Sequence, residues 1–86
     1  MELKDTVELM LSDDFRDRLQ AEYDQLDIRI QKLEKAIEHW TKDKSKLSRP
    51  IYLPLFRRQL RYMKGYQKVL KHRMWFIELN DHARQD

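Results

Sequence analysis

The sequence of 86 residues contains no cysteine, one glycine and two prolines. Without cysteine the chain has no disulfide, no thiolate nucleophile and no zinc site with cysteine ligands. So little glycine and proline leaves few tight turns for a β-sheet. Since the 41% hydrophobic and 38% charged residues fall into long stretches without breakers, the composition predicts an all-α fold.

Long apolar runs are also missing, because no 18 consecutive residues are apolar. We therefore expect no transmembrane helix and no membrane partner. The N-terminal stretch MELKDTVELMLSDD is acidic and lacks a signal-peptide cleavage pattern, which favours a cytoplasmic protein. The length predicts one domain over residues 1–86, and a chain this short often completes its core by association.

Charge is strongly separated along the chain, although the net value is only +3. Residues 1–43 contain 12 acids and 7 bases, whereas residues 44–77 contain 10 bases and no acid. A segment of one sign repels itself unless an anionic group lies nearby. This anionic group could come from the acidic first half of the chain, from a second copy of it, or from a ligand that carries phosphate.

Two apolar series, each with alternating spacings of four and three, predict two long helices that pack along a heptad seam. The first series is Leu19, Tyr23, Leu26, Ile30, Leu33, Ile37 and Trp40. The second series is Phe56, Leu60, Met63, Gln67, Leu70, Met74 and Ile77. Their equal length predicts an antiparallel hairpin, with Trp40 near Phe56 and Leu19 near Ile77.

Breakers and capping residues set the expected helix limits. Ser12 is the predicted N-cap of a first long helix over 13–42. Polar residues and two prolines mark a connection over 43–54, and the second long helix is expected over 55–80.

A short helix or arm is predicted over residues 1–11. Leu3, Val7 and Met10 recur at helical spacing, so they share one face. That face is expected to pack on the hairpin or on a neighbouring chain.

The second long helix carries two stripes beside its seam. The basic stripe is Arg57, Arg61, Lys64, Lys68 and Lys71. The apolar stripe is Gln59, Tyr62, Tyr66, Val69, Arg73 and Phe76. A hairpin cannot cover the apolar stripe, so we predict an interface between copies of the chain, formed by Tyr62, Tyr66, Val69 and Phe76. The alternative is that the N-terminal arm covers it within the chain.

The basic stripe is a candidate anion site, with Arg57, Arg61 and Lys64 as candidate contacts. Exposed helices usually mix charges of both signs to gain i,i+4 pairs, and this stripe does not. Arginine forks and lysine point charges both suit phosphate. A solvated helix face without a ligand is the alternative.

The connection KSKLSRPIYLP offers a hydroxyl at Ser48, a guanidinium at Arg49 and an aromatic ring at Tyr52. Such groups hold nucleotides by stacking and by hydrogen bonds to phosphate, although an ordinary capping loop is the alternative. Phe15 and Arg16 place another ring beside a cation in DDFRDRLQAEY.

Patterns for catalysis and metal binding are missing. The three histidines, His39, His72 and His82, have no metal-ligand spacing, and no nucleophile turn is visible. Small helical chorismate mutases have a similar size and basic pockets, but the first seam here is apolar throughout. We expect no enzyme, no metal and no cofactor.

Several stretches resemble a family of small helical phage proteins. SDDFRDR, which begins at Ser12, and the AEY that begins at Ala21 resemble the D-Y-K-x-R-x-x-A-E-Y block of these proteins. LFRRQLRYMKGYQKVLKHR, which begins at Leu55, resembles their L-L-x-x-Q-L-x-x-M-x-x-Y-x-x-x-L-x-x-R pattern. SRPIYLPL, which begins at Ser48, is similar to S-R-E-x-S-L-A-L in distant relatives. The family is that of the phage anti-CBASS cyclic-oligonucleotide sponges, whose hairpin domain also occurs in anti-Thoeris sponges.

The resemblance implies a non-enzymatic homo-oligomer, typically a hexamer built from dimers, in the cytoplasm of the infected bacterial host. Such a protein binds cyclic dinucleotides and often cyclic trinucleotides, and so prevents activation of the immune effector. Ser48 and Arg49 match the family's S-R, whereas Phe15 replaces a tyrosine of close relatives. Pro50 and Pro54 replace glutamate and alanine, so the connection departs from the family pattern.

Two other functions fit the residues. A small nucleic-acid-binding regulator would use the basic stripe on a phosphate backbone. Against it, no helix-turn-helix turn is visible and the first half is acidic, so DNA is not an expected partner. A structural adaptor hairpin would use the same stripe to bind an acidic protein.

Overall fold

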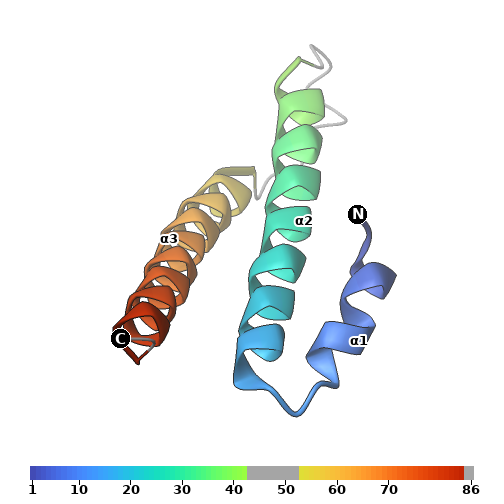
Figure 1. Ribbon diagram of the computed structural model, residues 1–86. Coiled ribbons are helices and arrows are strands. Elements are labelled where there is room, and N and C mark those ends of the chain that lie inside the picture. The colour runs from blue at the N-terminus through green and yellow to red at the C-terminus, as the bar shows by residue number, and fades with distance from the viewer. Residues whose placement is uncertain (43–52, 85–86) are drawn as a thin grey trace.

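The computed structural model describes the backbone of residues 1–42 and 53–84 and the side chains of residues 1–42 and 53–80. Its elements are the 3-10 helix η1 (Leu3–Thr6) and the α-helices α1 (Val7–Met10), α2 (Phe15–Lys42) and α3 (Leu53–Arg84). α2 lies between α1 and α3 (Figure 1). No strand occurs in the described residues, so the prediction of an all-α hairpin with a short N-terminal helix is confirmed. None of the described helices has the length and apolarity to cross a membrane.

The heptad seam joins α2 and α3, and every predicted seam residue is buried or half-buried. Leu70 is fully buried at the centre of this contact. At the closed end of the hairpin, where α2 ends and α3 begins, the rings of Trp40 and Phe56 stack with centroids 5.3 Å apart. At the opposite, open end, Leu19 and Ile77 line the same pocket. The predicted antiparallel register is therefore confirmed.

Gln67 is the polar member of the seam, and α2 supplies its partner. Its Nε2 donates to Oδ1 of Asp27 at 2.7 Å. The other oxygen of Asp27 accepts from Nε2 of Gln31 at 2.8 Å. Because a buried amide is costly without a partner, this pair favours the one register in which Gln67 faces Asp27.

The N-terminal segment packs on the face of α2 opposite the seam. Ala21 and Ile28 of that face are 0% and 8% exposed. Against them lies Thr6, whose buried hydroxyl donates to the carbonyl oxygen of Leu3 at 2.7 Å and accepts from Nε2 of Gln25 at 2.9 Å. The small side chain of Ala21 permits this close approach, and both hydrogen-bonding roles of the threonine are satisfied.

The prediction for the inward face of this segment was partly wrong. Val7 and Met10 are 45% and 47% exposed, whereas Thr6 is fully buried. The first turn is a 3-10 helix with three residues per turn, so Leu3 aligns with Thr6 and not with Val7. The alternative that this arm covers the apolar stripe of α3 is also wrong, because the arm contacts α2.

The start of α2 is capped by Asp14. Its Oδ1 accepts the backbone N–H of Arg16 at 2.9 Å, the usual role of an N-cap side chain. The predicted cap, Ser12, instead accepts the backbone N–H of Asp14 at 3.1 Å and donates to Oδ2 of Asp17 at 2.7 Å. Ser12 therefore orders the turn before the helix.

α3 is longer than the predicted range of 55–80. It begins at Leu53, so Pro54 lies in its first turn. An amide at that position has no partner within the helix, and proline therefore removes no hydrogen bond there. Most of the predicted connection lies outside the described residues.

Replacing Leu70 with alanine tests the seam. Leu70→Ala leaves a cavity at a fully buried position and should lower the free energy of unfolding by about 2–5 kcal/mol. The control is His72→Ala on an exposed face of the same helix, with an expected change within about 0.5 kcal/mol. Chemical denaturation followed by circular dichroism at equal protein concentration measures both, and equal losses would contradict the packing described.

Candidate anion-binding surface

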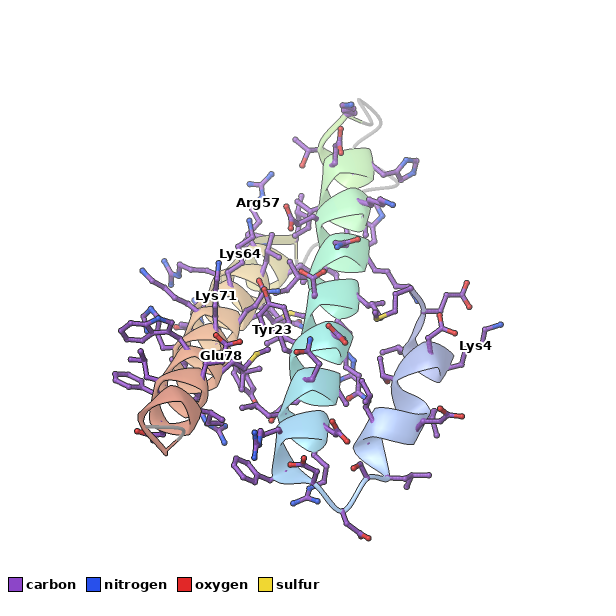
Figure 2. The ribbon with its side chains drawn as sticks, in the orientation of Figure 1. Lys4, Tyr23, Arg57, Lys64, Lys71 and Glu78 are labelled. Carbon is purple, nitrogen blue, oxygen red and sulfur yellow. The ribbon has the colours of Figure 1, made fainter. Side chains whose placement is uncertain are left out.

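The basic stripe lies along one exposed side of α3. Figure 2 shows Arg57, Lys64 and Lys71 following one another along that helix. All five members of the stripe are exposed to solvent. Their spacing of three and four residues places like charges on neighbouring turns, where they repel. The stripe is therefore a continuous cationic surface.

Acidic residues of α2 neutralise this surface only in part. Among the described side chains, one ion pair joins the two long helices: Lys64 Nζ lies 3.5 Å from Glu34 Oε2, and both side chains are about half exposed. No described carboxylate lies within ion-pair distance of Lys68 or Lys71. The described part of the acidic first half thus supplies one carboxylate to this surface and leaves a strong positive charge.

The two arginines of the stripe make weaker contacts near the closed end. Arg57 donates to the hydroxyl of Thr41 on α2 at 3.2 Å. The guanidinium of Arg61 lies 5.4 Å from the ring centroid of Tyr62, within cation–π range. Neither contact neutralises the charge, and both leave guanidinium donors for a phosphate.

Lys42 at the end of α2 is engaged differently. Its Nζ donates to Glu38 Oε1 at 2.7 Å. This hydrogen bond, followed by the attraction between the charges, lowers the pKa of the Glu38 carboxyl and raises that of the Lys42 ammonium. Lys42 is therefore paired within α2 and adds little to the basic stripe.

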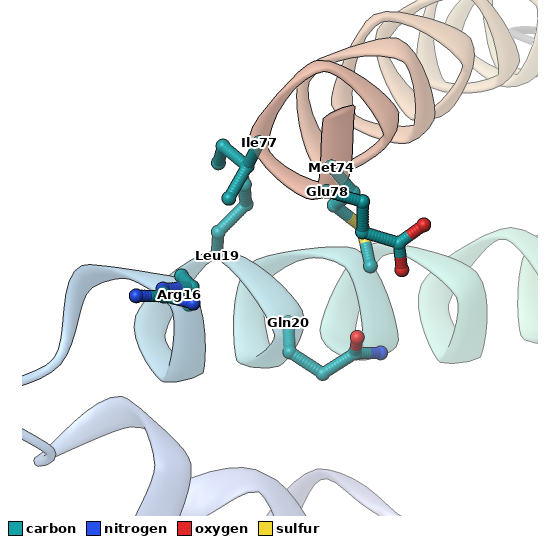
Figure 3. A pocket seen from close by; sticks show the side chains of 6 residues that line it. All are labelled: Arg16, Leu19, Gln20, Met74, Ile77 and Glu78. Atoms are coloured by element: carbon teal, nitrogen blue, oxygen red, sulfur yellow. The ribbon is translucent and has the colours of Figure 1, made fainter. Parts of the chain in front are cut away.

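Two adjoining pockets open between α2 and α3 toward the open end of the hairpin. The first, of about 280 Å³, is lined by Arg16, Leu19, Gln20, Met74, Ile77 and Glu78 (Figure 3). The second, of about 320 Å³, is lined by Tyr23, Lys71, Met74, Trp75 and Glu78. Met74 and Glu78 belong to both pockets, and Lys71 joins the second pocket to the basic stripe.

The candidate residues lie at opposite ends of the hairpin. Arg57, Arg61 and Lys64 share one exposed side of α3, near the closed end. Phe15, which is 53% exposed, and Arg16 lie at the start of α2, near the open end. Along α2, Arg16 lies about 27 Å from Glu34, the partner of Lys64, and about 38 Å from Thr41, the partner of Arg57. One chain therefore does not bring these groups to a single site.

The candidates of the connection, Ser48, Arg49 and Tyr52, lie outside the described residues. Within the described part of the chain, no group of three or more histidine, aspartate or glutamate side chains is placed to hold a metal ion.

Among known protein families, Sequestin matches residues 13–76. The chain belongs to the Sequestin family. The match covers α2 and most of α3, so it includes the basic stripe, the apolar stripe and every seam residue except Ile77. It confirms the resemblance to a sequestering family that the sequence stretches indicated. No curated protein and no solved structure matches the chain.

The apolar stripe of this Sequestin hairpin stays exposed in the single chain. Its large side chains Tyr62, Tyr66, Val69 and Phe76 are between 47% and 63% exposed. The hydroxyl of Tyr66 donates to the carboxylate of Glu22 on α2, which ties one edge of the stripe to the other helix. The N-terminal arm lies on the far side of α2 and covers none of it (Figure 1).

Sequence reasoning missed Trp75 and Glu78 of the second pocket, and it assigned Tyr23 to the core alone. Tyr23 is half-buried on the seam and also lines the second pocket. Lys71, Trp75 and Glu78 follow the helical spacing i, i+4, i+7, so they share one face of α3. That spacing was the feature of the sequence from which these pocket residues could have been predicted.

Charge reversal at Lys68 tests whether the basic stripe strains the unliganded fold. Lys68→Glu turns two repulsions, with Lys64 and Lys71, into attractions and should raise the free energy of unfolding by about 0.5–1 kcal/mol at low salt. Lys68→Gln, which only removes the charge, should have an intermediate effect. Thermal unfolding at low and high salt measures the change, and a loss of stability in Lys68→Glu at low salt would contradict the argument.

Proposed function

We propose that this protein binds and sequesters cyclic dinucleotides and cyclic trinucleotides without converting them, and so blocks CBASS effector activation in a phage-infected bacterium. The observation that carries the proposal is the basic stripe, a cationic surface to which α2 contributes a single described ion pair. Membership of Sequestin, a family named for sequestration, supports a binding role. The resemblance of the sequence stretches to phage sponges supports this choice of ligand.

The charge of the ligand suits the charge of the stripe. A cyclic dinucleotide carries two negative phosphates and a cyclic trinucleotide carries three, at fixed positions on a compact ring. Arginine and lysine from one or more copies of α3 would surround such a ring. Binding would relieve repulsion among the cations. Because a ligand that binds only the folded protein stabilises it by mass action, ligand at 100 times its dissociation constant should stabilise the protein by about 2.7 kcal/mol.

Association of copies forms part of the proposal. The apolar stripe is a row of large exposed side chains on a helix whose opposite side already packs on α2. A second copy related by a two-fold axis would cover the stripe with the same stripe. If the axis is perpendicular to α3, the two α3 helices run antiparallel, and Phe15 and Arg16 of one copy approach the end of the partner's α3 that carries its first arginines. Further association of dimers would give the hexamer that the resemblance implies.

Native mass spectrometry tests ligand and assembly together. The protein is measured alone and with a panel of cyclic dinucleotides and trinucleotides. We expect a multiple of the subunit mass, a whole number of bound ligands, and ligand recovered chemically intact. A lone subunit that binds no member of the panel would overturn the proposal.

A labelled DNA duplex and a labelled RNA in the same buffer separate this function from a nucleic-acid-binding regulator. Phosphate-backbone binding would weaken steeply as salt rises, because each neutralised phosphate releases a counterion. Tight binding of these probes, with no affinity for cyclic nucleotides, would support the regulator instead.

A charge in the apolar stripe tests the interface. Val69→Glu places a carboxylate in the centre of the proposed contact and should reduce the assembly to smaller species, because a buried unpaired charge is costly. His72→Glu adds the same charge on another exposed face of α3 and should leave the mass unchanged. Sedimentation velocity measures both, and an intact assembly in Val69→Glu would place the interface elsewhere.

A further inference from the structure

We propose that the groove around Trp75 is a base-binding subsite that prefers guanine, an inference that rests on the proposed function. The groove has a volume of about 320 Å³. One wall is α3, which contributes Lys71, Trp75 and Glu78, and the other is Tyr23 of α2. Lys71, Tyr23 and Glu78 lie close together at this junction in Figure 2. The groove thus combines a cation, two aromatic rings and a carboxylate.

Trp75 supplies the stacking surface. Its side chain is 55% exposed, although the seam residues on either side, Met74 and Ile77, are half-buried. The indole therefore contributes little to the packing of the hairpin. The ring of Phe76 meets it edge-on, with centroids 5.0 Å apart, and limits its orientation. An exposed, oriented indole beside a cationic surface is suited to stack on a nucleobase.

Glu78 supplies the selectivity. Its carboxylate accepts no hydrogen bond and forms no ion pair with any described side chain, and it repels phosphate. A carboxylate only accepts hydrogen bonds, so it recognises a pair of adjacent N–H donors. Guanine presents such a pair on its Watson–Crick edge, N1–H and the N2 amino group. Adenine presents one donor beside an acceptor lone pair, which the carboxylate repels.

Lys71 completes the order of groups along α3. It lies four residues before Trp75 and seven before Glu78, which is about 6 Å and about 10 Å along the helix axis. The order of these groups along α3 matches the order of groups in a guanine nucleotide. Lys71 would meet the phosphate, Trp75 the face of the base, and Glu78 the donor edge of the base. Lys71 also belongs to the basic stripe, so the subsite is continuous with the proposed anion site.

Calorimetric titration tests the subsite with cyclic diguanylate, cyclic diadenylate and the mixed guanylate–adenylate ring. We expect Trp75→Leu to weaken the binding of guanine-containing rings about tenfold or more, through loss of stacking. Glu78→Gln should reduce the preference for guanine over adenine about tenfold, because one acceptor becomes a donor. The control is Glu8→Gln, which removes an exposed carboxylate on α1, outside the groove, and should change neither affinity nor preference.

Tryptophan fluorescence gives a second readout. The chain has two tryptophans, so Trp40→Phe leaves Trp75 as the single emitter and keeps an aromatic ring against Phe56. Cyclic diguanylate should quench this emission over the same concentration range as the calorimetric binding. Binding without quenching would place the base elsewhere and overturn the subsite.

The two failures are distinguishable. If wild-type protein binds none of the three rings and no cyclic trinucleotide, the proposed function is overturned together with the subsite. If the wild type binds them and both groove variants keep its affinity and base preference, the subsite alone is overturned. Circular dichroism of each variant confirms that the helices are retained.

Discussion

The packing of α2 on two opposite faces is the constraint on which the rest of the structure depends. One face carries the seam to α3, and the other, centred on Ala21 and Ile28, carries the N-terminal segment with its buried Thr6. The N-terminal segment and α3 therefore both pack on α2, and α3 is covered by α2 on one side only. The described residues supply no further element for its remaining faces. The basic stripe and the apolar stripe, the surfaces proposed for ligand binding and for assembly, therefore both lie on α3.

The basic stripe lowers the stability of the fold. Its cations repel at helical spacing, and the pair between Lys64 and Glu34 is too exposed to offset this repulsion, since such pairs contribute little. The seam has to stabilise α3 on its own, through Leu70 and the stacked rings of Trp40 and Phe56. A protein selected for stability alone would mix charges on this side, so the stripe supports the proposal of an anionic ligand.

Much of the fold was predictable because burial follows the spacing of apolar residues. Alternating steps of four and three fix which side of a helix is buried, and the predicted seam is correct at every position. Periodicity carries no information on 3-10 geometry, so the burial of Thr6 was missed. It also did not show that Asp27 is the partner of Gln67. The groove at Trp75 and Glu78 was harder to predict, because its second wall comes from another helix and depends on how the two helices rotate about their axes.

In the proposed assembly, association and ligand binding would be linked. Pairing two copies through the apolar stripe brings a second cationic helix close to the first, so the burial of Tyr62, Val69 and Phe76 is opposed by electrostatic repulsion. A compact polyanion held by lysines and arginines of both copies removes that repulsion. If the ligand binds the associated form more tightly than the single chain, the ligand strengthens association by the same free energy, because linkage is reciprocal. In that assembly, a cationic helix that is uncovered in the single chain would become the element through which assembly and sequestration reinforce each other.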